Sequence, residues 1–204
     1  MRDVRVCVFG DSFVVGIGDP TALGWVGRVA VRTPEALNVH LTMYPLGVRG
    51  ESTEEIVVRI PLESAARFAR GDQHGIVIAA GIADAYRGLP AARSAAALDF
   101  GLGSSDVSTL VVGPPPLGDA ALTARIAAVD EAFRDVCNGR GVPYISTYER
   151  LIRRPSWQRA KAADGIHPDR AGYAMLSRIV LDGGWSSWLD MLSPEHAGKE
   201  DRAR

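Results

Sequence analysis

The chain has 204 residues, of which 47% are hydrophobic and 23% charged, and its net charge is −1. This composition is that of an average globular protein and excludes disordered, fibrous and coiled-coil chains. Acidic and basic residues nearly balance and are mixed along the sequence, so composition gives no support to nucleic-acid binding, which normally goes with a basic face or a high pI. We therefore expect a single domain over residues 1–192 with no nucleic-acid partner. Composition predicts no oligomeric state.

The first ten residues lead directly into an apolar, strand-like segment. They lack the hydrophobic region of roughly 7 to 15 residues and the cleavage site that mark a secretion signal. The longest apolar stretch, residues 75–83, has about half the length that a membrane-spanning helix needs. We therefore predict a cytoplasmic protein without a membrane span. Cys7 and Cys137 lie far apart and lack a metal-binding spacing, so we expect two reduced core residues.

Short apolar runs alternate with amphipathic stretches, which is the pattern of βα units on a parallel sheet. Several of these runs are apolar throughout, as strands covered on both faces are. In chain order, strands are expected at Val4 to Phe9, Val39 to Leu46, Gly75 to Ala80, Thr109 to Val112 and Pro143 to Ile145. The predicted fold class is α/β, a three-layer α/β/α sandwich with a five-stranded parallel sheet.

The first predicted helix covers about residues 52–69. Ser52 and Glu55 have the spacing of a capping box at its start, and Pro61 is expected to kink this helix or break it in two. Over residues 122–136, apolar side chains recur at helical spacing on one face, which should be buried.

The end of the chain is expected to be helical and then polar. Tyr173 to Val180 form an amphipathic segment, and Trp185 to Leu192 suggest a short final helix. Residues 193–204 are polar and lose this periodicity, so we expect a frayed tail.

The first candidate functional segment comprises Gly10, Asp11 and Ser12, which follow the first predicted strand without a gap. Ser12 would emerge at the carboxyl end of a parallel strand, where open α/β sheets bind their ligands. The same residue types also favour an ordinary strand-ending turn. The tripeptide alone is therefore equally consistent with a site and with a turn.

The second candidate segment, DGIHP at residues 164–168, precedes the late amphipathic helix. A serine nucleophile needs a neutral imidazole to accept its proton, and that imidazole needs a carboxylate on its other nitrogen. A tight turn eased by Gly165 can bring Asp164 to His167. Taken alone, this segment is more typical of an exposed loop followed by a helix that starts near Pro168.

Together with a glycine-rich segment, LGVRGES at residues 46–52, these motifs follow the block order of the GDSL or SGNH hydrolases. The chain resembles this family from Val4 to about Leu181. The resemblance implies a flavodoxin-like fold in which Ser12 attacks the substrate, His167 transfers the proton and Asp164 orients His167. It also implies that the N–H groups of Ser12 and Gly50 form the oxyanion hole. The residues agree, because Gly50 precedes a predicted helix, whose N-terminal N–H groups favour an anion.

The third block departs from the family pattern. After the strand at residues 75–80 the family has GxND, whereas this chain reads GIAD at residues 81–84. Ala83 therefore stands where the family has an oxyanion asparagine, and we expect a modified hole, helped by a bound water or by Arg49. Loss of one such donor costs roughly 10² to 10³ in turnover in other hydrolases. Asp84 is expected to hold its loop by accepting backbone hydrogen bonds.

The sequence thus predicts a serine hydrolase that cleaves a small carboxylic ester or thioester through an acyl-enzyme, without a metal or organic cofactor. Ala83 motivates one alternative, a catalytically impaired relative that binds an acyl or acetylated-sugar ligand. An acyltransferase that uses the same intermediate is another. The residues do not select among lipid, thioester and acetylated-sugar substrates. Residues expected to form the wall of the site are Asp11, Arg49, Ala83, Asp84, Pro114 and Trp157.

Overall fold

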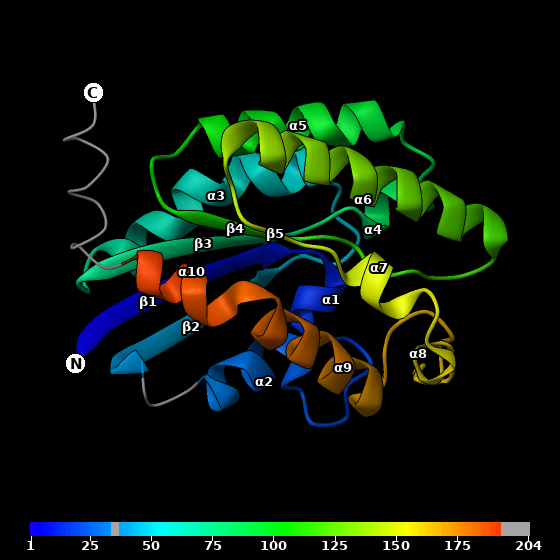
Figure 1. Cartoon of the computed structure of the whole chain (residues 1–204), viewed down its shortest axis with the longest axis horizontal. Coiled ribbons are helices and arrows are strands. Elements are labelled where there is room, and N and C mark those ends of the chain that lie inside the picture. Colours follow the sequence, from blue (N-terminus) through cyan, green and yellow to red (C-terminus); the bar gives the residue numbers. More distant parts are fainter. Residues whose placement is uncertain (34–36, 193–204) are drawn as a thin grey trace.

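The computed structural model describes residues 1–33 and 37–192. Five parallel strands form one sheet in the order β2-β1-β3-β4-β5 (Figure 1). They are β1 (Arg2–Gly10), β2 (Val39–Gly47), β3 (Gln73–Ala79), β4 (Thr109–Val112) and β5 (Tyr144–Ile145). The predicted α/β sandwich with a five-stranded parallel sheet is therefore confirmed. The predicted polar tail, residues 193–204, lies outside the described residues.

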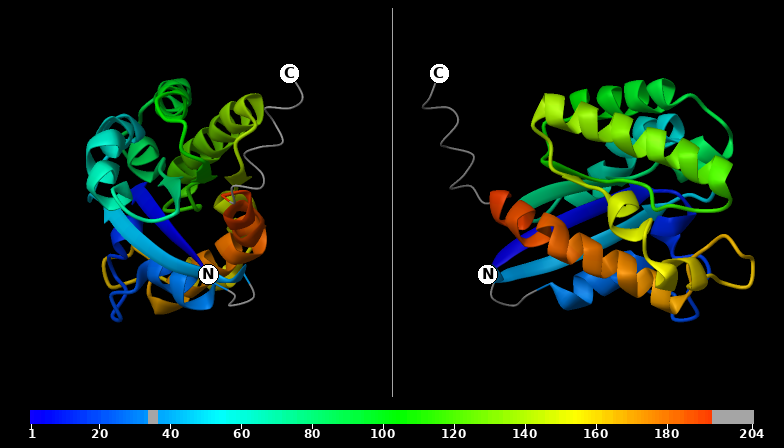
Figure 2. Two further views of the ribbon diagram at one scale, coloured as in Figure 1. Left: turned by 90° about the vertical axis from the view of Figure 1, so that its left-hand side faces the viewer. Right: turned by 45° about the vertical axis from the view of Figure 1, so that its right-hand side comes forward.

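Helices cover both faces of the sheet and produce three layers (Figures 1 and 2). One face carries α3 (Thr53–Phe68), α4 (Ile82–Tyr86), α5 (Ala91–Gly103) and α6 (Ala120–Arg140). The other carries α1 (Ser12–Val15), α2 (Gly24–Arg32), α9 (Arg170–Val180) and α10 (Ser186–Met191), while α7 (Thr147–Leu151) and α8 (Pro155–Arg159) follow β5. Among the described residues, no helix combines the length and the apolar character needed to cross a bilayer.

Both faces of β1, an interior strand of the sheet, are buried, which explains its continuous apolar sequence. In β1, residues 6–9 are fully inaccessible, and Cys7 is one of them. Cys137 is equally buried in α6, and neither thiol forms a disulfide. Burial raises the pKa of each thiol to about 12, so both stay protonated at neutral pH. These features agree with the expectation of reduced core cysteines.

The helix α3 begins as its capping box predicts, but it is not divided. Ser52 accepts a hydrogen bond from the Glu55 N–H, and the Glu55 side chain accepts one from the Ser52 N–H. The helix then continues through Pro61, so of the two predicted outcomes the break is wrong, and the kink stays a prediction. The helix is buried through Ile56 and Ile60 before Pro61 and through Ser64 after it. This packing outweighs the missing backbone donor of one proline.

The strand order creates a switch point at the carboxyl edge of the sheet. β1 lies between β2 and β3, and its last residue, Gly10, aligns with Gly47 on one side and Ala79 on the other. The chain leaves β1 for one face of the sheet and β3 for the opposite face. Crevices for ligands form at such points in open α/β sheets. The segments that follow the three strands therefore meet at one edge.

Candidate active site

Ser12 is the first residue of α1, and only Asp11 separates it from the end of β1 at Gly10. The Asp11 carboxylate caps this short helix by accepting the Phe13 N–H at 2.9 Å. Phe13 and Val14 are buried, which fixes the turn in the core while Ser12 stays 8% exposed. The Ser12 Oγ lies 2.9 Å from Nε2 of His167, 155 residues later in the chain.

Asp164 organises both its own turn and the imidazole of His167. One carboxylate oxygen accepts the N–H groups of Ile166 and His167, each at 3.0 Å. The other lies 2.5 Å from Nδ1 of His167. The hydrogen bond from the imidazole, followed by those from the two backbone N–H groups, holds the pKa of the Asp164 carboxyl well below its usual range. An ionised carboxylate only accepts hydrogen bonds, so Nδ1 carries the proton and Nε2 can accept one from Ser12.

The loop that carries His167 is anchored on both sides. Lys161 and Pro168 form an antiparallel bridge, within which the Ala162 N–H donates to the His167 carbonyl at 2.8 Å. Gly18 lies against the loop with a φ of +90°, and a Cβ there would be 2.8 Å from the Pro168 carbonyl oxygen and 3.1 Å from the His167 Cβ. Gly18 is therefore needed both for its backbone conformation and for the close approach of the loop.

Two buried acids lie beneath the turn at Ser12. Asp11 is 2% exposed, and burial raises the pKa of its carboxyl to about 7. The Phe13 and Ala83 N–H groups oppose this shift, whereas the negative charge of Asp84 adds to it. Asp84 accepts the N–H and the hydroxyl of Thr53, at 2.9 and 3.0 Å, and the Ser94 hydroxyl at 2.8 Å. Asp84 thus ties α4 to the N-terminus of α3 and to α5.

Gly50 lies in the exposed turn between β2 and α3. Its φ of +79° is one that other residues rarely adopt, although a Cβ would meet no atom within 4 Å. The Gly50 carbonyl accepts a hydrogen bond from Arg87, whose guanidinium also contacts the Glu55 carboxylate at 2.9 Å. Arg49 is exposed beside it. The turn that would present the Gly50 N–H is thereby held to α3 and to the end of α4.

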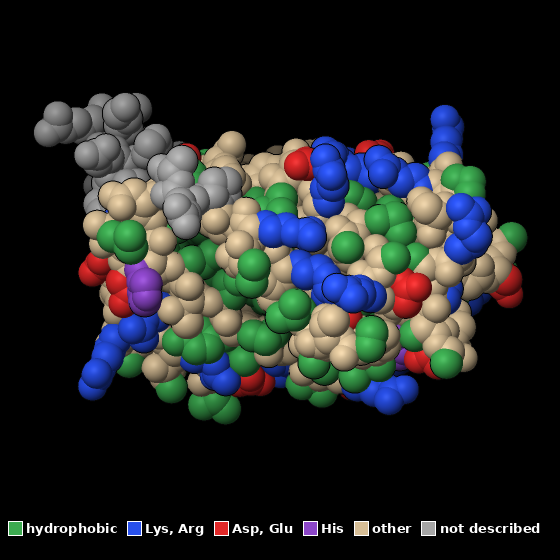
Figure 3. All heavy atoms as spheres, turned by 90° about the horizontal axis from the view of Figure 1, so that it is seen from below, with side chains coloured by type: hydrophobic (Ala, Val, Ile, Leu, Met, Phe, Trp, Pro, Cys, Tyr) green, Lys and Arg blue, Asp and Glu red, His purple; other side chains and the backbone are tan. Residues whose placement is uncertain are grey.

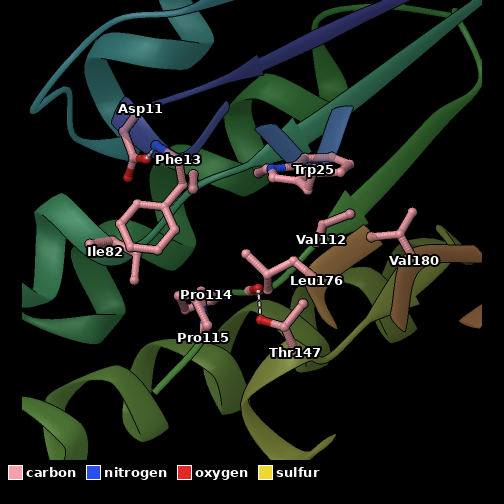
Figure 4. A pocket seen from close by; sticks show the side chains of 13 residues that line it. Asp11, Phe13, Trp25, Ile82, Val112, Pro114, Pro115, Thr147, Leu176 and Val180 are labelled. Carbon is pink, nitrogen blue, oxygen red and sulfur yellow. Dashed lines mark hydrogen bonds between the residues drawn. The ribbon is translucent and has the colours of Figure 1, made fainter. Parts of the chain in front are cut away.

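The remaining wall candidates do not line one common space. A small cavity of about 30 Å³ lies among the strand ends and α9, and both Asp11 and Pro114 line it (Figure 4). Such a space holds about one water molecule rather than a substrate. Ala83, 7% exposed, lies in α4. Trp157 is 1% exposed in α8, where its indole N–H donates to the Pro116 carbonyl at 2.7 Å.

Sequence reasoning missed three residues that hold this edge together, namely Gly18, Arg59 and Arg87. The Arg59 guanidinium donates to the carbonyl groups of Gly10, at 3.1 Å, and Leu46, at 2.7 Å, so it joins the ends of β1 and β2. These partners lie 49 and 13 residues away. No local spacing could have indicated them.

Comparisons with known proteins identify the family and the fold of the chain. The family model for GDSL-like lipases and acylhydrolases matches residues 8–175. A search of curated proteins gives no significant match.

Solved structures show the same fold. A lipolytic protein of the G-D-S-L family from Veillonella parvula has a TM-score of 0.71 at 19% identity, covering 88% of this chain and 97% of that one. The esterase EstA from Pseudoalteromonas, inhibited by monoethylphosphonate, has a TM-score of 0.69 at 16% identity, with coverage of 91% and 98%. A mutant acetyl-xylooligosaccharide esterase from Geobacillus has a TM-score of 0.70 at 17% identity, with coverage of 89% and 93%. At these identities the likeness establishes the fold alone.

Proposed function

The chain belongs to the family of GDSL-like lipases and acylhydrolases, which are carboxylic ester hydrolases, and we propose that it cleaves a small ester or thioester through an acyl-enzyme on Ser12. The observation that carries this proposal is the continuous series of hydrogen bonds from Asp164 through His167 to the Ser12 Oγ. Three side chains with these roles are what a serine nucleophile requires.

In the proposed reaction, the Ser12 Oγ attacks the carbonyl carbon of the ester while Nε2 of His167 takes the hydroxyl proton. Asp164 stabilises the imidazolium that results and keeps it oriented. The imidazolium then gives its proton to the departing alcohol or thiol, which leaves the acyl group on Ser12. A water molecule then gives a proton to the same Nε2 and attacks the acyl carbonyl. The imidazolium returns this proton to the Ser12 Oγ as the bond to the acyl group breaks and the acid leaves.

The oxyanion of each tetrahedral intermediate would be held by the N–H groups of Ser12 and Gly50. Both belong to turns that the structure fixes, through the Asp11 cap and the bond from Arg87 to Gly50. Ala83 offers no side-chain donor, so the hole depends on backbone groups with help from a water or Arg49. Fixed donors of this kind provide much of the rate enhancement in acyl transfer.

A catalytically impaired relative that binds an acyl or acetylated-sugar ligand is the second candidate, and Ala83 is the observation that favours it. The hydrogen-bonded set of Ser12, His167 and Asp164 favours the enzyme, because a binding protein has no need of a nucleophile with its base. An acyltransferase would use the same set and differ only in the acceptor. The cytoplasmic location stays a prediction.

The experiment is a series of 4-nitrophenyl esters from acetate to laurate, assayed with wild type and Ser12→Ala. Ser187→Ala, at an exposed position of α10, is the matched control. We expect turnover by wild type and the control, with an initial burst of nitrophenol where deacylation is slow, and no turnover by Ser12→Ala. Partition of the acyl group to an added alcohol would identify a transferase. Binding without turnover by wild type would support the impaired relative, and equal rates in Ser12→Ala would remove Ser12 as nucleophile.

A further inference from the structure

The segment that leads into the candidate active site carries an uncompensated positive charge. Residues 150–161 contain five cationic side chains and no acidic one: Arg150, Arg153, Arg154, Arg159 and Lys161. Within the described part of the chain, none of the five forms an ion pair or a side-chain hydrogen bond. The four arginines are exposed. On the face shown in Figure 3, most Lys and Arg side chains lie in the central and right-hand parts.

A pocket of about 510 Å³ lies between this segment and the loop that follows β4. Its lining includes Pro116, Leu117, Thr123, Trp157, Lys161 and Gly165. Gly165 belongs to the turn between Asp164 and His167, and Pro116 continues the segment that lines the small cavity beside Asp11. The pocket therefore adjoins the loop that bears the imidazole. Its volume lies within the usual range for small-molecule sites, roughly 300 to 1,000 Å³.

Lys161 is the unusual residue of this pocket. Its Nζ is buried and has no hydrogen-bond partner among the described residues. It lies 4.5 Å from the centre of the Trp157 ring, which the bond to the Pro116 carbonyl holds in place. Burial lowers the pKa of Lys161 to about 8, although the charge of Asp169 acts in the opposite direction.

The charge of Asp169 acts on this ammonium group only from a distance, and no described carboxylate forms an ion pair or a hydrogen bond with it. A cation–π contact contributes about 0.5 to 2 kcal/mol, whereas removing an ammonium from water costs several kcal/mol. Buried charges in proteins are normally paired or hydrogen-bonded for this reason. An anion that enters the pocket would supply the missing partner, because rotation of the flexible lysine side chain can bring Nζ to it.

We propose that this pocket is a subsite for an anionic group, a carboxylate or a phosphate, carried by the ester substrate. Lys161 is its counter-ion, and the four neighbouring arginines raise the local concentration of anionic substrates. The inference rests on the proposed function, because it concerns a substrate held by Ser12. It narrows the substrate class from small esters in general to esters with a negative charge on the acyl or the alcohol part.

Two matched ester pairs test this subsite and show which part of the substrate carries the charge. The acyl pair is 4-nitrophenyl hemiglutarate against 4-nitrophenyl valerate. The alcohol pair is 3-carboxyphenyl acetate against 3-carbamoylphenyl acetate. The measured quantity is the ratio of kcat/KM for the anionic ester to that for its neutral partner, in wild type, Lys161→Gln and Lys161→Arg. Arg178→Gln, an exposed charge loss on α9, is the control.

In at least one pair, we expect Lys161→Gln to lower this ratio about tenfold or more, mainly through the KM of the anionic ester. Lys161→Arg should retain most of the preference, and Arg178→Gln should leave the ratio within about twofold at moderate salt. If Lys161→Gln leaves the kcat/KM ratio unchanged in both pairs, the proposed subsite is refuted. Unchanged ratios would mean that Lys161 only packs on Trp157.

A second measurement separates this inference from the proposed function. Acetic anhydride should acylate Lys161 in the wild-type protein, and inorganic phosphate should slow that reaction in a concentration-dependent way, as read by mass spectrometry of the peptide. If wild type hydrolyses none of the four esters, the proposed function fails, and protection by phosphate still reports on the pocket. Absence of protection would count against the anion subsite whatever the esterase result.

Discussion

Replacing Asp164 by asparagine changes one hydrogen bond of the candidate active site and leaves two in place. The asparagine carbonyl can still accept the N–H groups of Ile166 and His167, which the Asp164 carboxylate accepts at 3.0 Å. The amide NH₂ then faces Nδ1 of His167 and only donates. The imidazole must therefore take the tautomer with its proton on Nε2, which cannot accept the Ser12 proton.

The expected result is a fall in kcat of roughly 10⁴, as the same change produces in a serine protease. This corresponds to about 5.5 kcal/mol in the activation free energy. The effect on stability should be much smaller, because the Asp164 side chain is 39% exposed and solvent screens its charge. Its pKa is lowered in the folded state, so the stability it contributes is present above the unfolded value and lost as the pH falls below about 4.

The assay is the steady-state hydrolysis of 4-nitrophenyl acetate, with thermal unfolding measured on the same samples. Asp169→Asn is the matched control, since it removes the same charge two residues after His167. Asp169 caps α9 and does not contact the imidazole, and asparagine is an equally good N-cap. The control should keep near wild-type turnover. An Asp164→Asn protein that also retains turnover within about threefold would refute the role of this carboxylate.

Three further substitutions test the surroundings of the site. Ala83→Asn should raise kcat on a short ester by tenfold or more, because one added oxyanion donor is worth roughly 10² to 10³ in kcat. A lower kcat at unchanged Tm would indicate that Arg49 or a water molecule already donates to the oxyanion at this position. Asp11→Asn should weaken the dependence of the unfolding free energy on pH. Because the pKa of Asp11 is raised to about 7, its contribution to the unfolding free energy is fully present below about pH 4 and is lost as the pH rises through 7, a change of at most about 4 kcal/mol. Urea unfolding at pH 5 and 9 measures this change, and an equal difference in wild type and Asp11→Asn would contradict it. Gly18→Ala should lower both Tm and kcat. The control is Gly88→Ala, whose φ is +71° and whose Cβ would meet no atom within 4 Å, so it should lose only about 1 to 2 kcal/mol of stability through its backbone conformation. Equal effects of the two substitutions on kcat would mean that the contact of Gly18 with His167 is unimportant.

The predicted elements that agree with the structure are those whose sequences carry a strong local or burial signal. The sheet is covered on both faces, so its central strands are continuous apolar runs that stand out from the surrounding sequence. The capping box at Ser52 marks the start of α3. The helix α5 (Ala91–Gly103) was not predicted, because it is alanine-rich and buries only Ser94, Leu98 and Gly101. Such a sequence has no clear apolar stripe.

The site residues, too, fall into those that short sequence motifs predict and those that only the fold brings together. Gly10 to Ser12 and Asp164 to His167 are short motifs, and the structure brings Ser12 to His167 within hydrogen-bond distance. The contacts of Arg59 and the burial of Lys161 depend on partners that only the folded chain brings together. Sequence spacing contains no information on such contacts, although the run of positive charge over residues 150–161 is visible in the sequence itself.

Whether Ser12 is the nucleophile is tested most directly by the site at which a fluorophosphonate attaches to the active protein. The reagent should modify one residue per chain, and mass spectrometry of the digest should place the adduct on the peptide that contains Ser12. Loss of esterase activity should follow the extent of labelling, and neither Ser12→Ala nor His167→Ala should be labelled at a comparable rate. An adduct on another serine that abolishes activity, or full activity with Ser12 modified, would contradict the assignment.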